Sequence, residues 1–404
     1  MGNTDNEDLF IEHGNQPWLV RHDSSGFGGP ASIEVEGREI LRDCNLYIDD
    51  LNENNGILKR FSCNRKAGTA LVTSKGYFPF GEEPSFKQQW KYGQNHVQIT
   101  FDLQWPQGMR VKRRVGLGSC FLPGTWKRFY CIPPVEHLNK GVQADWISLP
   151  EACSEPVMVA HWHFPPLALV FENKDRDQLE IGTGGDLWRW ENPFKAGPER
   201  GSYKVYLTVD GLQIVWEPLM CCLPYTPPPQ NYRFKWYMAW NTETAETSEG
   251  RDAQKLSLDE RGKCSMPESV EEGDSYVLDF EQLLSSQNTR NVPTQQDYIR
   301  GSYKRGLCWS SKPVLNAAKK AVRQISESLP PGTLILKGVS ADACWNPAHL
   351  DKNCADGVPH WDINALLEFS HWTRRQLGDD WKILTMPPAS NLPSVRGLFQ
   401  DNGF

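Results

Sequence analysis

Residues 202–218, SYKVYLTVDGLQIVWEP, contain the clearest local structure in the sequence. The dipeptide Asp210-Gly211 is typical of the tight turn that joins two antiparallel strands. Apolar side chains occupy alternate positions before the turn and return to that spacing after it: Val205, Leu207, Val209, Ile214 and Trp216. This two-residue period predicts a β-hairpin with one apolar face.

The same period extends from about residue 17 to residue 240. It recurs in ASIEVEGREI (31–40), HVQITFDLQW (96–105), LALVFEN (167–173) and RFKWYMAW (233–240), whereas no helical period of 12 or more residues is present. Many short strands over about 220 residues are typical of a large all-β sandwich or barrel. We therefore predict a mainly β protein, with a large antiparallel β-sandwich domain over residues 1–241.

The pattern changes after this segment. Residues 242–300 begin with a polar, charged run, which predicts a linker or an exposed excursion. Within 301–404, two amphipathic runs at 310–332 and 361–378 alternate with the apolar runs TLILKGV and WKILTM. Helix and strand at this spacing predict a small C-terminal α/β segment with parallel strands.

Composition narrows the partners and the compartment. A net charge of −7 argues against a nucleic-acid partner, and no apolar stretch approaches the 18 residues of a membrane span. Eleven scattered cysteines include no CxxC pair, and the N-terminus lacks the features of a signal peptide. We expect a reduced, cytoplasmic protein without a cofactor; a homo-oligomer remains open.

The segment GTGGDLWRWEN, residues 182–192, is the first candidate site. On a strand, Asp186, Trp188 and Trp190 share one face, and Arg189 and Glu191 lie on the other. Indole rings beside a carboxylate can stack on a sugar and bond its hydroxyl groups. The same residues also suit a cross-strand tryptophan pair that only stabilises a sheet. The sixteen tryptophans of the chain allow either use.

Two further segments carry polar side chains in suggestive patterns. His161 and His163 in HWHFPP share a face of an extended segment, but the sequence offers no third metal ligand, so we expect hydrogen bonding and no metal. The long loop 338–362 contains Asp342, Trp345 and His349 and follows a predicted parallel strand, where ligands commonly bind. It lacks the calcium-ligand spacing of an EF-hand.

Motifs for nucleophilic or phosphate chemistry are missing: there is no GxSxG, P-loop, HExxH or kinase signature. Acid–base chemistry by a pair of carboxyl groups is the enzymatic option that the sequence contradicts least. The acids nearest the tryptophan-rich segments are Asp186, Glu191, Glu217, Asp342 and Asp351. We predict Asp186, Glu191 and Asp342 as catalytic, with Trp188, Trp190, Arg189, His161, His163, Trp345 and His349 binding substrate.

The strand series from ASIEVEG to KWYMAW, with WRWEN inside it and α/β elements after it, resembles carbohydrate-active proteins with a galactose-mutarotase-like β-supersandwich. The resemblance is architectural, covers about 60% of the chain, and matches no family motif. It implies a glycoside hydrolase in which a barrel follows the β domain. The chain departs from that pattern, because about 100 residues follow position 300 and a full barrel takes about 250.

The first functional hypothesis is therefore a glycoside hydrolase with a carboxylate pair in a cleft floored by tryptophan. A non-catalytic glycan-binding module would use the same tryptophans without paired acids. A scaffolding protein would use them as interface anchors. The sequence leaves all three open.

Overall fold

The computed structural model describes most of the chain between residues 7 and 385. The longer stretches outside the described residues are 1–6, 12–17, 23–28, 133–145, 183–202, 242–252, 291–305, 350–359 and 386–404. Shorter gaps of one to four residues include 163–165, 340–342 and 345.

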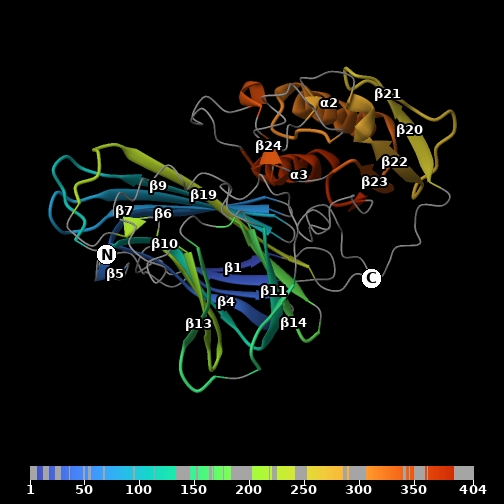
Figure 1. The fold of residues 1–404 in the computed structure, drawn as a ribbon. Coiled ribbons are helices and arrows are strands. Elements are labelled where there is room, and N and C mark those ends of the chain that lie inside the picture. Colours follow the sequence, from blue (N-terminus) through green and yellow to red (C-terminus); the bar gives the residue numbers. More distant parts are fainter. Residues whose placement is uncertain are drawn as a thin grey trace.

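Two large antiparallel sheets face each other and form a β-sandwich (Figure 1). Sheet A has the order β1 (Glu7–Ile11), β2 (Trp18–His22), β3 (Pro30–Val35), β4 (Arg38–Ile48), β10 (Arg114–Pro123), β17 (Gly211–Trp216), β16 (Tyr203–Thr208) and β13 (Val157–Trp162), with β5 (Leu51–Asn52) beside β4 and β18 (Leu219–Met220) beside β10. Sheet B has the order β12 (Ile147–Ser148), β11 (Trp126–Ile132), β14 (Ala168–Asn173), β15 (Gln178–Gly182), β19 (Asn231–Asn241), β9 (His96–Gln104), β8 (Ser85–Tyr92), β7 (Thr69–Tyr77) and β6 (Ile57–Lys66). The predicted mainly β sandwich is confirmed.

The predicted hairpin is β16–β17, with Val205 opposite Ile214 and Thr208 opposite Gly211. Gly211 serves a packing need as well as the turn. A Cβ atom at this position would lie 2.1 Å from the carbonyl oxygen of Leu122 in β10, so any side chain would push the two strands apart. The turn and its neighbouring strand are therefore fixed together.

The space between the sheets is filled largely by aromatic side chains. Trp90 and Trp216 both pack edge-on against Trp236, with ring centroids 5.6 and 5.9 Å apart. Eight described tryptophans are buried: Trp90, Trp105, Trp126, Trp216, Trp236, Trp240, Trp309 and Trp381. The tryptophan excess therefore serves the protein interior in most of the described chain.

The C-terminal unit is an α/β layer. Its sheet has the order β21 (Cys264–Ser265), β20 (Gln254–Leu258), β22 (Ser275–Asp279), β23 (Thr333–Lys337) and β26 (Lys382–Thr385), and the last four are parallel. The helices are η5 (Phe280–Leu283), α2 (Lys312–Ser328), η7 (Pro347–His349) and α3 (Ile363–Leu377), and β24 (Ala343–Cys344) pairs with β25 (His360–Trp361). The predicted α/β segment is confirmed. None of the described helices is long and apolar enough to cross a membrane.

Strands β20 and β22 lie within residues 242–300, for which the sequence predicts a linker or excursion. They bury Leu256, Leu258, Tyr276, Val277 and Leu278 between polar, charged turns. Five-residue strands in a charged setting produce too short an apolar run to be recognised by periodicity. The division at residues 241 and 300 stays a prediction, although the parallel sheet includes residues from 254 onward.

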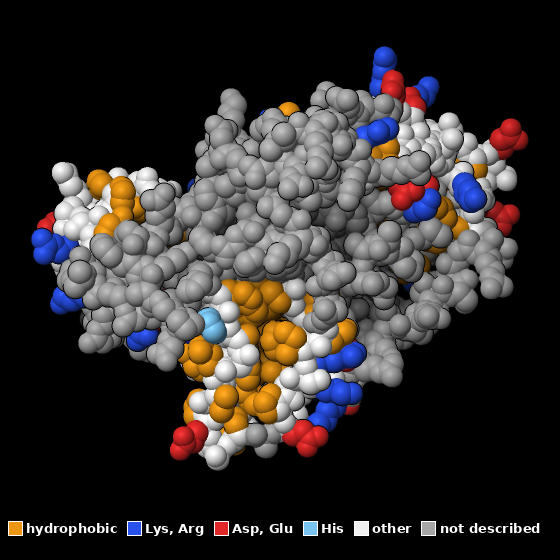
Figure 2. All heavy atoms as spheres, in the orientation of Figure 1, with side chains coloured by type: hydrophobic (Ala, Val, Ile, Leu, Met, Phe, Trp, Pro, Cys, Tyr) orange, Lys and Arg blue, Asp and Glu red, His pale blue; other side chains and the backbone are white. Residues whose placement is uncertain are grey.

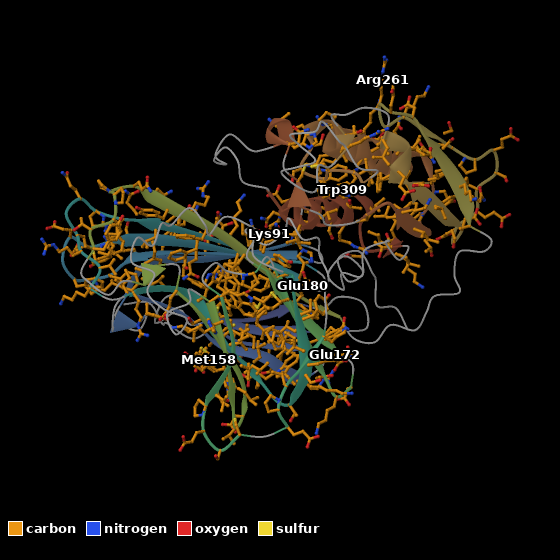
Figure 3. The ribbon with its side chains drawn as sticks, in the orientation of Figure 1. Lys91, Met158, Glu172, Glu180, Arg261 and Trp309 are labelled. Carbon is orange, nitrogen blue, oxygen red and sulfur yellow. The ribbon has the colours of Figure 1, made fainter. Side chains whose placement is uncertain are left out.

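The α/β unit packs on the face of sheet B that points away from the sandwich core. Tyr130, Ala168, Val170 and Tyr237 of sheet B belong to the same hydrophobic cluster as helices α2 and α3. Gln98 Nε2 also donates to the backbone oxygen of Asn364 at 3.3 Å. In Figure 3, Lys91 and Glu180 lie on the part of sheet B nearest this unit.

A pair of buried histidines lies at this contact. The rings of His96 and His371 are 4.7 Å apart, edge to face. Burial, followed by the charge of Lys91, lowers the pKa of His96 to about 3. Burial, with His96, Lys91 and Arg375 nearby, lowers the pKa of His371 well below its ordinary value. The facing groups also include Glu368 and Lys319, which act on Lys91. Both imidazoles are therefore neutral in the folded protein at neutral pH.

We predict that stability falls as the pH drops below about 6.5. Between that ordinary histidine pKa and the lower folded values, the unfolded chain binds more protons than the folded chain. Above pH 6.5 the free energy of unfolding has its full value. As the pH falls from 6.5 towards 3, each histidine lowers it by up to about 1.4 kcal/mol per pH unit. Urea denaturation between pH 7.5 and 5 measures this loss. The double variant His96→Gln, His371→Gln should flatten the slope, and an unchanged slope would contradict the assignment.

Candidate functional site

Most of the predicted site residues lie outside the described residues: Asp186, Trp188, Arg189, Trp190, Glu191, His163, Asp342 and Trp345. Their proposed roles stay predictions. The structure describes the positions of His161 and His349, which lie in different parts of the fold: His161 is in β13 of sheet A, and His349 ends η7 in the α/β unit.

A cluster of polar side chains lies on the face of sheet A that points away from the sandwich core. Glu217 directly follows β17, and its carboxylate contacts Lys204, whose strand neighbour Val215 lies on the face opposite the core-packed Trp216. Lys204 of β16 lies opposite His161 of β13 and opposite Val215 of β17. Residues opposite each other in a sheet point to the same face, so Lys204, His161 and Val215 lie on the face that Glu217 contacts. Tyr47 of β4 and Arg114 of β10 complete what we call the Glu217 cluster, defined as Tyr47, His161, Arg114, Lys204 and Glu217.

The carboxylate of Glu217 is the centre of this cluster. Tyr47 Oη donates to Glu217 Oε1 at 2.6 Å, and Arg114 Nη1 lies 3.0 Å from the same oxygen. Lys204 Nζ lies 3.4 Å from Oε2. The Glu217 side chain is 1% exposed and that of Lys204 is 8% exposed, whereas that of Arg114 is 41% exposed. A buried carboxylate thus has Tyr47 and Arg114 as donors to Oε1 and Lys204 as a donor to Oε2, which offsets the cost of its burial.

The electrostatics of the cluster keep the Tyr47 phenol neutral. Burial, reinforced by the nearby Glu217 charge and the hydrogen bond to it, raises the pKa of Tyr47 far above its usual value. Burial and the Glu217 charge also raise the pKa of Tyr206. Tyr47 therefore keeps its proton at any physiological pH and is a fixed hydrogen-bond donor.

One open edge of the sandwich is apolar. Val157 of β13 and Ile147 of β12 are each 48% exposed. Figure 2 shows hydrophobic side chains gathered around β13 and β14. Val157 pairs with Leu207 and Ile147 pairs with Phe129, both of the sandwich core, so these apolar side chains lie on the inner faces of the two sheets.

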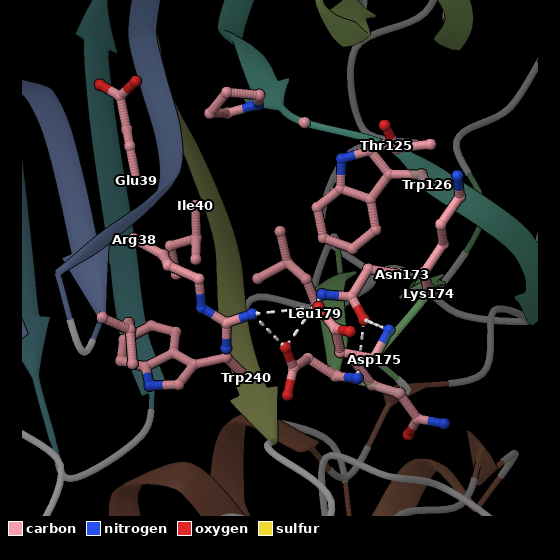
Figure 4. A pocket seen from close by; sticks show the side chains of 15 residues that line it. Arg38, Glu39, Ile40, Thr125, Trp126, Asn173, Lys174, Asp175, Leu179 and Trp240 are labelled. Carbon is pink, nitrogen blue, oxygen red and sulfur yellow. Dashed lines mark hydrogen bonds and ion pairs between the residues drawn. The ribbon is translucent and has the colours of Figure 1, made fainter. Parts of the chain in front are cut away.

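A separate cleft lies between the ends of the two sheets (Figure 4). Its cavity volume is about 590 Å³, within the usual range for small-molecule sites. The lining comes from the β3–β4, β10–β11 and β14–β15 turns and from the end of β19. Trp126 and Trp240 lie on opposite sides of it, but only 9% and 6% of their surfaces are exposed.

An ion-pair network crosses this cleft. Arg38 Nη1 lies 2.7 Å from Asp177 Oδ2 and 3.7 Å from Asp175 Oδ2. Asn173 Nδ2 donates to Asp177 Oδ2 at 2.9 Å. Arg38 thus engages both aspartates as an opposite charge. Its groups suit hydrogen bonding to a polar ligand better than proton transfer.

His349 lies in the predicted long loop and is buried. Its Nδ1 is 3.5 Å from Cys344 Sγ, and its Nε2 is 3.2 Å from Asn346 Nδ2. The structure therefore does not bring His349 and His161 into one site. This result separates two residues that were predicted to bind the same substrate.

Glu217 was among the acids singled out by its position near tryptophans, but its partners were not. The alternation of the β16–β17 hairpin already places Lys204 and Glu217 on one face, and that spacing could have identified the pair. Tyr47 and Arg114 are 170 and 103 residues from Glu217. Only the strand order β4-β10-β17-β16 brings them together, and local sequence patterns do not specify that order.

Comparison with known proteins gives structural neighbours only. No family model and no curated protein matches the sequence. The chain is similar to a galactose mutarotase related enzyme from Lactobacillus acidophilus (10% identity, 60% of this chain and 100% of that chain, TM-score 0.35). It is also similar to a family 36 α-galactosidase from Geobacillus stearothermophilus in complex with raffinose (9%, 97% and 74%, TM-score 0.37) and to a variant of a glycoside hydrolase family 97 enzyme from Pseudoalteromonas sp. strain K8 (10%, 96% and 68%, TM-score 0.36). The neighbours thus include mutarotase-related and glycoside hydrolase structures, as the architectural resemblance predicted.

Removing the Tyr47 hydroxyl tests the energetics of the Glu217 cluster. Tyr47→Phe should lower the free energy of unfolding by about 1–3 kcal/mol, because a buried carboxylate loses a short hydrogen bond. Tyr77→Phe is the control: the Tyr77 ring packs under Lys59 Nζ at 4.3 Å, a contact that phenylalanine retains, so the change should stay within about 0.5 kcal/mol. Urea denaturation measures both. Equal effects would show that Tyr47 Oη contributes nothing specific.

Proposed function

We propose that this is a carbohydrate-active protein that hydrolyses a glycoside, and that the sugar binds at the Glu217 cluster. The observation that carries the proposal is the buried Glu217 carboxylate, held by Tyr47, Arg114 and Lys204 on the face that also carries His161. These side chains supply a base, a neutral hydrogen-bond donor and two cations within one site. That combination suits a substrate whose hydroxyl and ring oxygens exchange protons as it reacts.

The roles follow from the charges of the groups. Glu217, which lies between two cations, would accept a proton from a sugar hydroxyl or from a water. Arg114, the most exposed of the three partners, would bond the sugar hydroxyls at the mouth of the site. His161 would bind the sugar beside them, as the sequence predicts.

Glycoside hydrolysis needs a second carboxyl group. We propose that Asp186 or Glu191 supplies it, with Trp188, Trp190 and Arg189 binding the sugar ring and His163 bonding its hydroxyls. The chain connection supports this choice, because residues 183–202 lead directly into β16, where Tyr203 pairs with Trp216 and Lys204 reaches Glu217. Asp342, Trp345 and His349 would belong to a second region of the chain. A cytoplasmic location stays part of the proposal.

A non-catalytic glycan-binding function is the second candidate, and the cleft of Figure 4 favours it. Arg38, Asn173 and Asp177 offer directed hydrogen bonds, and Asp175 and Asp177 are both engaged by the Arg38 cation. In this case the protein would bind a sugar through Arg38 and leave it unchanged.

A glycan panel distinguishes these functions. Binding is read from intrinsic tryptophan fluorescence, and hydrolysis from released reducing sugar. Glu217→Gln should lower the hydrolysis rate by about 100-fold or more, since positioned acid–base groups contribute at least that much. Asp186→Asn should abolish turnover while binding persists.

Glu172→Gln is the matched control. Glu172 is also a buried carboxylate paired with an arginine, at 2.7 Å from Arg128, but it lies in β14 of sheet B. Its variant should hydrolyse within about twofold of the wild type, with near-ultraviolet circular dichroism confirming the fold of both. If the protein binds a glycan without hydrolysing it, and Arg38→Ala abolishes that binding, the glycan-binding function is favoured over the hydrolase. No response to any glycan would favour the scaffolding function.

A further inference from the structure

Two thiols and an imidazole meet at the carboxyl edge of the parallel sheet. Cys308 lies in the connection that follows β22 and precedes α2, while Cys344 and His349 lie in the connection that follows β23. Their Sγ, Sγ and ring nitrogen atoms all lie within 4.8 Å of one another, and all three residues are buried. In parallel α/β sheets, this edge is where ligands are commonly held.

Backbone contacts fix the two cysteines in place. Cys308 N donates to Thr289 O at 2.9 Å, and Cys308 O accepts from Ser311 N at 3.0 Å, at the start of α2. Cys344 lies in β24 and pairs with His360 of β25. Both cysteines are thiols rather than a disulfide. The donors therefore come from separate segments that the fold holds at fixed positions.

The imidazole is oriented from both sides. His349 Nδ1 faces Cys344 Sγ at 3.5 Å, and Nε2 faces the Asn346 carboxamide at 3.2 Å. Asn346 Oδ1 also accepts from Ala348 N at 3.1 Å, which ties the carboxamide to the turn that carries His349. A partner on the outer ring nitrogen is the usual arrangement of a metal-binding histidine, because it fixes the ring while the other nitrogen faces the metal.

We propose that Cys308 Sγ, Cys344 Sγ and His349 Nδ1 bind a Zn²⁺ ion. Two thiolates and one imidazole form a ligand set that zinc prefers, and tetrahedral geometry places such donors roughly 3.5–3.8 Å apart. Binding releases one proton from each thiol, and the two thiolate charges cancel the charge of the ion. The buried site then carries no net charge, which removes most of the cost of burying ions.

The Asn346 carboxamide can serve the bound form as well. With the metal on Nδ1, the ring proton is on Nε2 and needs an acceptor. In this structure Asn346 Nδ2 faces Nε2, so in the metal-bound form the carboxamide would have to turn and present its oxygen to Nε2–H. A water completes the coordination of the ion.

The ion would fasten the long connection 338–362 to the segment before α2. This site is absent from the expectations drawn from the sequence, which included no metal. Its donors are 36 and 5 residues apart along the chain, so no compact ligand motif exists. Buried thiols that pack as small apolar groups are the competing explanation, but they do not require an imidazole nitrogen directed at the sulfur.

Metal content and Co²⁺ substitution of the full chain test the proposal. The purified protein should bind one Zn²⁺ per chain, and the Co²⁺ form should show tetrahedral d–d bands with thiolate-to-cobalt charge transfer. Cys344→Ser and His349→Gln should lose the ion or the charge-transfer intensity. Asn346→Ala should weaken Zn²⁺ binding by about 10- to 100-fold, since it removes only the partner of the ligand.

Cys264→Ser is the matched control, because Cys264 is buried in β21 outside the cluster. It should keep one ion per chain and the full spectrum. Circular dichroism shows whether each variant is folded. The Asn346→Ala variant keeps all three proposed metal donors, so a change in its Zn²⁺ affinity reports on the partner of His349 alone. A protein that binds no ion, a Co²⁺ spectrum without thiolate charge transfer, or a Cys308–Cys344 disulfide found by alkylation and mass spectrometry would overturn the proposal.

Discussion

The pairing of β16 with β17 places Trp216 inside the sandwich and Lys204, the partner of Glu217, on the opposite face, and both the core and the candidate site depend on it. Trp216 packs against Trp236 and Tyr203 between the sheets. Glu217 collects three donors from β4, β10 and β16 on the other side. A slip of one residue in this strand would bury a carboxylate among indoles and expose a tryptophan. Core packing and site geometry are therefore set by the same hydrogen-bond register.

The sequence contains enough information for the local elements and the fold class. The alternation around Asp210-Gly211 identifies β16 and β17, and Pro313 and Gly378 mark the beginning of α2 and the end of α3. Strands β20 and β22 cannot be recognised from the sequence, because two or three buried side chains between charged turns do not form a clear two-residue period. Short strands depend on their neighbours in the sheet for stability.

The candidate site is less predictable, for a physical reason. Glu217 stands out only after its partners are known, and Tyr47 and Arg114 reach it through strand order. The number of tryptophans also does not distinguish a core from a sugar-binding surface, because an indole ring uses the same faces to pack in a core and to stack on a sugar. Most tryptophans of the described chain are buried in the core. The residues of WRWEN remain the open case.

The two halves of the protein meet on the outer face of sheet B, and the Glu217 cluster lies on the outer face of sheet A. The close-packed tryptophan core fills the space between them. A perturbation in the loop that carries His349 would have to cross both sheets to reach Glu217. Residues so far apart and without shared partners usually contribute independently to stability. Substitutions in one half of the protein are therefore expected to leave the stability of the other half unchanged.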